Sequence, residues 1–321
     1  MPKLSVVVPL HNVAPFADAT LGSLARNADP DIEFLLVDDC STDDTPALVD
    51  RWADRLPQAR VIRHETNVGI AAARNSGIDA ARGDFVTFLD GDDWYAPGHL
   101  TRLLHAAQEL DCDFARTDHV QATGTSRVVR RAPARLRDTV MDPREGIASP
   151  EWETMVDYPF VWAGIYHRRL FEDGGQRFTT RLRTAEDRLW VWQLHLNART
   201  YAALSLYGIF YRRGVTTSLT QIKDSRQLDF FPAYDTLLGQ LREDRDADIL
   251  LPKAVRTYCA MIAFHNEKAD AYEPATLRRL RQESTAALHR MPQPVLDRTL
   301  TMMDTRRSTL LNRLRDKQKA A

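Results

Sequence analysis

The chain has 321 residues, nearly equal numbers of acidic and basic side chains, and a formal net charge of −1. This length allows one large domain and an accessory one, and the charge balance excludes a chain-wide basic field for binding nucleic acid. The sequence contains no run of about 18 apolar residues, so we expect no membrane-spanning helix.

The cysteines indicate the compartment. Cys40, Cys112 and Cys259 are odd in number and far apart, so they form neither a zinc-binding spacing nor a disulfide framework. The first predicted strand begins at residue 4, and no signal peptide is expected before it. We therefore expect a protein of the reducing cytoplasm.

The first 90 residues alternate between short apolar runs and amphipathic stretches. Strands are predicted at residues 4–9, 32–37, 61–62 and 84–89, and helices at 14–28, 42–52 and 70–81. Strands that alternate with helices require right-handed crossovers. The sequence therefore predicts an α/β fold with a mostly parallel sheet and helices on both faces.

Three carboxylates follow the fourth strand within four positions: Asp90, Asp92 and Asp93. Carboxylates this close repel one another unless a cation or hydrogen-bond donors neutralise them. Their hard oxygen atoms suit Mg²⁺ or Mn²⁺ held partly by the phosphates of a substrate. An acidic turn in which Asp93 caps the next helix explains the motif equally well.

Polar residues also follow the other predicted strands. Pro9 and Asn12 end the first strand, Asp39 follows the second and Asn67 the third. Ligands gather outside the carboxyl ends of strands in such sheets. A carboxylate such as Asp39 can accept from the N–H edge of a uracil. Arg74, in the following helix, can reach a phosphate or an aspartate, although a structural ion pair explains it equally well.

The middle of the chain is predicted to add a helix at residues 100–110 and a strand hairpin at 114–120 and 126–131. A loop at residues 132–150 follows. This region is rich in arginine, and a solvated loop is the favoured explanation of its charge. The arginines concerned are Arg130, Arg131, Arg135 and Arg137.

Two further segments carry candidate chemistry. Glu186 and Asp187 open a predicted helix, whose N-terminus stabilises an anion. This position suits a helix cap, which the spacing favours, and also a base that faces a cavity. A predicted strand at residues 207–213 leads into a hydroxyl-rich loop at 214–218, which can close over a diphosphate while Arg212 adds charge.

The remainder, from residue 225, is predicted to be all helical. Leucines and a methionine at residues 296–314 follow four-and-three spacing, which fits a short coiled-coil seam or an ordinary helix packed on its own domain. The basic tail fits contact with anionic lipid, and a solvated basic face fits it better. We expect a catalytic domain at residues 1–222 and a helical region at 223–321.

Taken together, the motifs resemble those of family 2 glycosyltransferases with the GT-A fold. The resemblance is closest to bacterial enzymes that build or decorate wall polymers such as teichoic acids and capsules. The motifs that carry it, in chain order, are Val8–Pro9 with Asn12, Val37 to Asp43, Asn67 with Gly69 and Ala73 to Asn75, Leu89 to Asp93, Phe178, Glu186–Asp187, and Tyr211–Arg212 with Ser218.

The resemblance implies a role for each candidate residue. Asp187 would be the general base, with Glu186 as its neighbour, and Asp92 would ligate Mn²⁺ or Mg²⁺. Arg212 would contact the diphosphate of the donor. The remaining nucleotide-sugar-binding residues would be Pro9, Asn12, Asp39, Asn67, Arg74, Asp90, Gly91, Thr216 and Ser218.

The activity implied is metal-dependent, inverting transfer of a sugar from a UDP-sugar, similar to UDP-GlcNAc, to a hydroxyl of a polyol-phosphate or polysaccharide acceptor. The site would lie in the cytoplasm, at the inner face of the membrane if the basic tail binds lipid, and the C-terminal helix leaves a homo-oligomer open. One alternative is a nucleotidyltransferase, although residues 9–12 lack the glycines of a phosphate loop. The other is a non-catalytic polysaccharide-binding module.

Overall fold

The computed structural model describes residues 1–147, 149–214 and 224–316. The chain divides into two compact units. The first contains residues 1–145, 158–181 and 193–215, and the second contains 146–157, 182–192 and 216–321. The expected domain boundary between residues 222 and 223 lies outside the described residues and stays a prediction.

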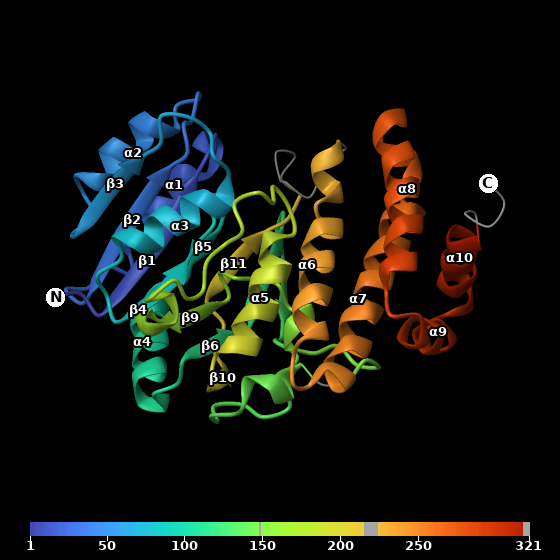
Figure 1. The fold of residues 1–321 in the computed structure, drawn as a ribbon. Coiled ribbons are helices and arrows are strands. Elements are labelled where there is room, and N and C mark those ends of the chain that lie inside the picture. The colour runs from blue at the N-terminus through green and yellow to red at the C-terminus, as the bar shows by residue number, and fades with distance from the viewer. Residues whose placement is uncertain (148, 215–223, 317–321) are drawn as a thin grey trace. The chain divides into compact units, whose positions relative to one another are not determined.

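A seven-stranded sheet forms the centre of the first unit (Figure 1). Its β9 runs antiparallel to both of its neighbours, and the other pairings are parallel, so the predicted mostly parallel sheet is confirmed. In spatial order the strands are β10 (Tyr201–Leu204), β6 (Phe114–Thr117), β9 (Gly164–His167), β4 (Phe85–Phe88), β1 (Leu4–Leu10), β2 (Ile32–Asp38) and β3 (Ala59–Arg63).

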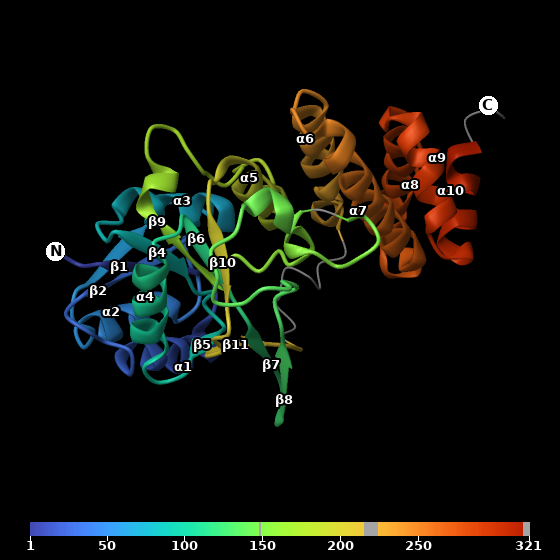
Figure 2. The same ribbon diagram turned by 90° about the horizontal axis from the view of Figure 1, so that it is seen from below.

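Helices cover both faces of this sheet, which is why β1, β2 and β4 are buried along their whole length. Figure 2 shows α3 on one face of β1 and β2, with α1 and α2 on the other. A Cβ added to Gly77 of α3 would lie 2.2 Å from Cγ1 of Val7, so only glycine allows this close approach. The helices are α1 (Ala14–Ala25), α2 (Thr45–Ala53), α3 (Ile70–Ala80) and α4 (His99–Leu110).

A second, four-stranded sheet completes the first unit, in the order β5 (Trp94–Tyr95), β11 (Ile209–Arg212), β7 (His119–Thr123) and β8 (Ser126–Arg130). The prediction of one strand over residues 114–120 is wrong, because the chain changes sheets at Asp118. Residues 114–117 join the large sheet as β6, and the hairpin forms between β7 and β8. The Asp118 carboxylate accepts hydrogen bonds from the Ala132 amide and from Arg137, both at 2.8 Å, which fixes the chain at this break.

The second unit is helical, as expected. Figure 1 shows α6, α7 and α8 side by side, and Lys253 of α7 is buried against Asp157 and the Trp152 carbonyl. None of the helices in the described ranges combines the length and apolar character that crossing a bilayer requires. The helices are the start of α5 (Glu186–Asn197), then α6 (Phe230–Arg242), α7 (Ala247–Glu267), α8 (Pro274–Arg290), α9 (Gln293–Met302) and α10 (Thr305–Asp316).

The leucine spacing at residues 296–314 does not form one continuous seam. It is divided between α9 and α10, and Met303 between them has an extended backbone. Leu296, Leu300, Leu311 and Leu314 are all buried within the chain. Of the two explanations of this spacing, the structure therefore favours ordinary helices packed on their own domain.

Candidate active site

The carboxylate turn after β4 lies against the end of β1. The Leu89 amide donates to the Val7 carbonyl at 3.0 Å, and the Asp93 amide closes the turn on the Asp90 carbonyl at 3.0 Å. A Cβ on Gly91 would lie 2.9 Å from Cδ2 of Leu10 and 3.1 Å from the Pro9 carbonyl oxygen. Glycine at position 91 therefore allows the carboxylates to lie beside the loop that follows β1.

Two of the three carboxylates are poorly hydrated. Burial, and then the charge of Asp90, raise the pKa of Asp92 to about 6, although Arg212 opposes this shift. Burial raises the pKa of Asp93 well above its usual range, and the charges of Asp92 and Asp90 add to the effect. A site that disfavours its own negative charge in this way is suited to receive a cation.

Arg212, at the end of β11, is fixed against this turn. Its main-chain amide donates to Oδ1 of Asp93 at 2.7 Å, and its Nε donates to the Asp92 carbonyl at 2.8 Å. The guanidinium lies over the ring of Trp94, 4.5 Å from the centroid. The small sheet thus places a positive charge beside the carboxylates. Asp93 does not cap the next helix, because the N-cap position of α4 is Gly98.

The donor atoms at this turn fit a divalent cation. Oδ2 of Asp93 is buried and has no hydrogen-bond partner among the described residues, and Asp92 supplies a second carboxylate. Among the described residues, no group of three or more histidine, cysteine or acidic side chains is arranged to bind a metal ion without further ligands. A cation here would therefore take ligands from a bound substrate as well, as Mg²⁺ commonly does with phosphates.

Asp39, at the end of β2, fixes the loop between β3 and α3. Its Oδ1 accepts from the Val68 amide at 3.0 Å and from Nδ1 of His64 at 2.8 Å, and its Oδ2 accepts from the Gly69 amide at 2.8 Å. Because each carboxylate oxygen can accept about two hydrogen bonds, Oδ2 retains one acceptor position. The contact between His64 and Asp39 was not predicted from the spacing of residues along the chain.

The residues around Asp39 hold the neighbouring loops together. Nδ2 of Asn67 donates to the Asp39 carbonyl at 3.4 Å. Oδ1 of Asn12 accepts from the Thr42 amide at 2.8 Å, which joins the loops after β1 and β2. The amide oxygen of Asn12 is thus already engaged by the protein. Pro9 is buried in β1 opposite Val37.

Arg74 reaches Asp90, which is one of the two kinds of partner predicted for it. Its Nη2 donates to Oδ1 of Asp90 at 2.8 Å, and its guanidinium lies 5.2 Å from the ring centroid of Phe178. Asn75 fixes that phenylalanine with two side-chain hydrogen bonds to its main chain, both of 2.9 Å. The consecutive residues Arg74 and Asn75 therefore support the carboxylate turn and the main chain at Phe178.

Glu186 and Asp187 belong to the second unit. They form the first turn of α5, where Oδ1 of Asp187 accepts from the Arg188 amide at 2.7 Å. Burial alone would lower the pKa of the Arg188 guanidinium, but Tyr234 and the Asp187 carboxylate raise it. Thr216 and Ser218 lie outside the described residues.

The family model described as "Glycosyl transferase family 2" matches residues 5–179. The chain belongs to glycosyltransferase family 2. The match includes the ends of β1, β2 and β4 with their polar residues, while Glu186, Asp187 and Arg212 lie beyond it.

Similar proteins include the uncharacterized glycosyltransferase EpsJ of Bacillus subtilis, 29% identical over 282 residues, which are 81% of this chain and 79% of EpsJ. The poly(ribitol-phosphate) beta-N-acetylglucosaminyltransferase TarS of Staphylococcus aureus is 30% identical over 216 residues, 66% of this chain and 35% of TarS.

Solved structures share the fold. Residues 1–349 of S. aureus TarS in complex with UDP-GlcNAc match with a TM-score of 0.77 at 21% identity, covering 98% of this chain and 88% of that one. The mannosyltransferase PcManGT of Pyrobaculum calidifontis, in complex with GDP-Man and Mn²⁺, matches with a TM-score of 0.54 at 19% identity, covering 98% and 88%. The GT-A-like fold with a helical C-terminal region is therefore confirmed.

Proposed function

We propose that this glycosyltransferase transfers a sugar from a UDP-sugar, similar to UDP-GlcNAc, to a hydroxyl of a cell-surface polymer, with inversion at the anomeric carbon and with a divalent cation. One observation carries the proposal: the half-buried carboxylate of Asp92 and the buried carboxylate of Asp93 lie beside Arg212 at the carboxyl end of β4. This arrangement gives a nucleotide diphosphate both a cation site and a fixed guanidinium.

The relatives support this choice of substrates. The name of TarS states a β-linked N-acetylglucosamine transfer to poly(ribitol-phosphate), and its structure was solved with UDP-GlcNAc. PcManGT was solved with a nucleotide sugar and Mn²⁺. A polyol-phosphate or polysaccharide acceptor and a UDP-sugar donor are therefore the substrates that we assign.

In the donor site, the remaining acceptor position on Oδ2 of Asp39 would receive the N3–H of uracil, with Pro9 and Asn67 shaping the base pocket. Asp90 would face the nucleotide, and Arg74 would position Asp90 through their ion pair. Arg212 would donate to the diphosphate, assisted by Thr216 and Ser218. Gly91 and Asn12 would keep the loops at this edge in place.

Asp92, with Oδ2 of Asp93, would hold Mn²⁺ or Mg²⁺. A bound divalent cation neutralises the negative charge that develops on the leaving diphosphate. The guanidinium of Arg212 adds to this stabilisation because it is fixed before the reaction begins.

Asp187 would accept the proton of the acceptor hydroxyl as that oxygen attacks the anomeric carbon. Attack from the face opposite the diphosphate converts an α-linked donor into a β-linked product without a covalent enzyme intermediate. Glu186 would support the orientation of Asp187 in the first turn of α5.

The donor site can be tested by calorimetry with UDP in the presence and absence of Mn²⁺. We expect UDP to bind more tightly with Mn²⁺, and Asp92→Asn to abolish that gain. Asp84→Asn is the matched control, since Asp84 is an exposed carboxylate just before the other end of β4. Equal UDP binding by wild type and Asp92→Asn at every Mn²⁺ concentration would refute the cation site.

The reaction can be tested by hydrolysis of a panel of UDP-sugars and GDP-mannose in the presence of Mn²⁺. Hydrolysis of a UDP-sugar would exclude the non-catalytic binding module. Formation of a nucleotide sugar from a nucleoside triphosphate and a sugar phosphate would instead identify a nucleotidyltransferase and overturn the proposal.

A further inference from the structure

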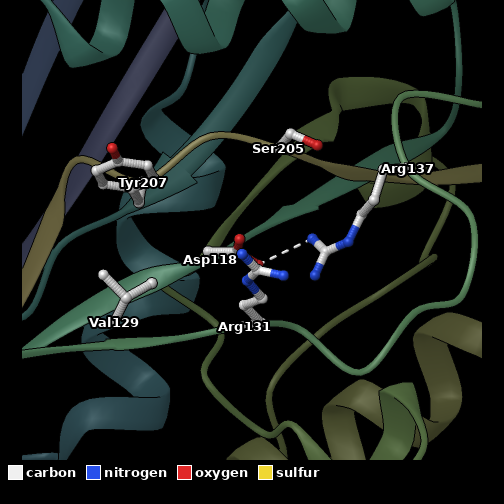
Figure 3. A pocket seen from close by; sticks show the side chains of 6 residues that line it. All are labelled: Asp118, Val129, Arg131, Arg137, Ser205 and Tyr207. Carbon is white, nitrogen blue, oxygen red and sulfur yellow. Dashed lines mark hydrogen bonds and ion pairs between the residues drawn. The ribbon is translucent and has the colours of Figure 1, made fainter.

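The first unit contains a cavity of about 500 Å³ that none of the site residues above lines. It opens at the amino end of the small sheet, between the start of β7, the end of β8 and the loop that leads into β11 (Figure 3). Its lining residues are Asp118, Val129, Arg131, Arg137, Ser205 and Tyr207.

The hairpin register explains why these side chains meet. His119 of β7 pairs with Arg130 of β8, so the next rung of the ladder sets Asp118 opposite Arg131. Directly opposite residues in an antiparallel pair point to the same face, and so do residues two apart on one strand. Asp118, Arg131 and Val129 therefore share the face that lines the cavity.

One wall of the cavity is fixed by an ion pair. Nη1 of Arg137 donates to Oδ1 of Asp118 at 2.8 Å and to the Leu204 carbonyl at 3.2 Å, and Nη2 donates to the Ala132 carbonyl at 2.7 Å. The dashed line in Figure 3 marks the pair with Asp118. Because the Ala132 amide also donates to Asp118, the backbone next to Arg131 is held in place.

The ion pair between Arg137 and Asp118 leaves the positive charge of Arg131 without a neutralising partner in the cavity. The Arg131 side chain is exposed and makes no ion pair within the described part of the chain. Asp118, the carboxylate that lines the same cavity, is already bonded to Arg137 and to a main-chain amide. Two guanidinium groups thus face one carboxylate, which leaves the cavity with an excess of positive charge.

The hydroxyl groups of Ser205 and Tyr207 add donors to the same cavity, and Tyr207 is 61% exposed. A guanidinium with nearby hydroxyls suits a phosphate group, whose several oxygen atoms accept hydrogen bonds from different directions. An exposed tyrosine ring beside them offers an apolar surface to the carbon chain that carries the phosphate.

The cavity and the donor site lie at opposite ends of one small sheet. Arg212 pairs with Ala122 of β7, and Asp118 precedes Ala122 by four residues, which corresponds to roughly 13 Å of extended chain. A few repeating units of a polymer bound at the cavity would therefore span the distance along β7 and β11 to Arg212.

We propose that this cavity binds a phosphate group of a polyol-phosphate acceptor chain, with Arg131 as the direct contact. The proposal rests on the proposed function for the identity of the chain as acceptor, but the phosphate site itself can be measured without turnover. Arg137 holds Asp118 and the main chain at Ala132 and Leu204 in place, and it is not expected to contact the phosphate.

The test uses the full chain and a synthetic oligo(glycerol phosphate), titrated by calorimetry with UDP and Mn²⁺ at saturation so that the donor site is blocked. We expect binding that weakens as salt is added, and a loss on the order of tenfold in Arg131→Gln. Arg135→Gln is the matched control, because Arg135 is an exposed arginine of the same loop that makes no ion pair with the residues the structure describes and does not line the cavity. It should bind as wild type does.

Equal losses in Arg131→Gln and Arg135→Gln would overturn the proposal by showing a diffuse basic surface. So would binding of neutral oligoglycerol as tight as that of the phosphate chain, or no binding of the phosphate chain. UDP titrated separately reports the donor site. If UDP fails to bind while the phosphate chain still requires Arg131, the proposed function fails and the phosphate site stands.

Discussion

Arg74 of α3 and Asp90 after β4 form an ion pair, with Nη2 of the arginine 2.8 Å from Oδ1 of the aspartate. The arginine side chain is 4% exposed and the aspartate 24%. The pair joins the helix that follows β3 to the carboxylate turn. It also offsets part of the negative charge that Asp90 places next to Asp92.

Replacing Arg74 with methionine should therefore destabilise the protein. The variant keeps much of the packing against Phe178 but leaves the Asp90 carboxylate without its buried partner. We expect the free energy of unfolding in urea to fall by about 2 kcal/mol, because Asp90 is partly hydrated and the full cost of a buried unpaired charge is not reached. Arg63→Gln, which breaks the exposed pair of Arg63 with Asp50, should cost less than about 1 kcal/mol. Equal costs would contradict the structural role of Arg74.

The raised pKa of Asp92 predicts how stability depends on pH in the absence of metal. A carboxyl group in the unfolded chain ionises near pH 4, whereas in the folded protein burial and Asp90 move the pKa of Asp92 to about 6. Between these values the folded protein holds a proton that the unfolded chain has lost. The contribution of Asp92 to the free energy of unfolding should therefore fall as pH rises from about 4 to about 6 and stay lower above that range.

Asp92→Asn removes this ionisation, so its free energy of unfolding at pH 7 without metal should exceed that of wild type by about 2 kcal/mol. Asp113 provides a control of opposite sign. Burial alone would raise its pKa, but the Arg199 amide and Arg169 lower it, so its contribution to stability is present above pH 4 and is lost as the pH falls. Asp113→Asn should destabilise the protein at pH 7. A loss of stability at pH 7 in both variants would refute the environment assigned to Asp92.

The close approach of the carboxylate turn to β1 can be tested at Gly91. The methyl group of Gly91→Ala would lie 2.9 Å from Cδ2 of Leu10 and 3.1 Å from the Pro9 carbonyl oxygen. The leucine can rotate, but the main-chain oxygen cannot move without shifting β1. We expect a loss of about 1–3 kcal/mol in unfolding free energy, together with weaker UDP binding.

Gly239 of α6 is the control, since nothing lies within 4 Å of a Cβ added there. Gly239→Ala should raise the stability by up to about 1 kcal/mol, because alanine favours a helix interior over glycine. If Gly91→Ala were as stable as wild type and bound UDP unchanged, the two loops would not be in the contact described.

The alternation of strands and helices was sufficient to predict the mostly parallel sheet, because the apolar runs that form β1, β2 and β4 are buried along their whole length. The break at Asp118 was not predictable in this way. Residues 114–120 have strand-forming character throughout, and only the distant Ala132 and Arg137 show why the chain leaves one sheet for another.

At the candidate site, too, local sequence patterns predicted some residues, whereas contacts between distant residues were not predictable. Spacing along the chain was enough to select the carboxylates after β2 and β4, since strand ends of a parallel sheet meet at one edge. It did not reveal that His64 donates to Asp39 or that Asn75 holds Phe178. Nor did it reveal that Arg212 donates its amide to Asp93. These contacts join residues 25 to 119 positions apart and depend on tertiary structure.

The role of Asp187 is tested by Asp187→Asn, which keeps the size of the side chain but cannot accept a proton. If Asp187 is the general base, transfer to the acceptor should fall by on the order of 10²–10⁴-fold while calorimetry shows unchanged UDP binding. Asp248→Asn is the matched control, because Asp248 is an exposed carboxylate in the first turn of another helix, α7. It should retain wild-type transfer. Glu186→Gln should reduce transfer less than Asp187→Asn, since Glu186 is assigned only a supporting role. Unchanged transfer in Asp187→Asn, or a loss of UDP binding equal to the loss of transfer, would contradict the assignment of Asp187 as the base.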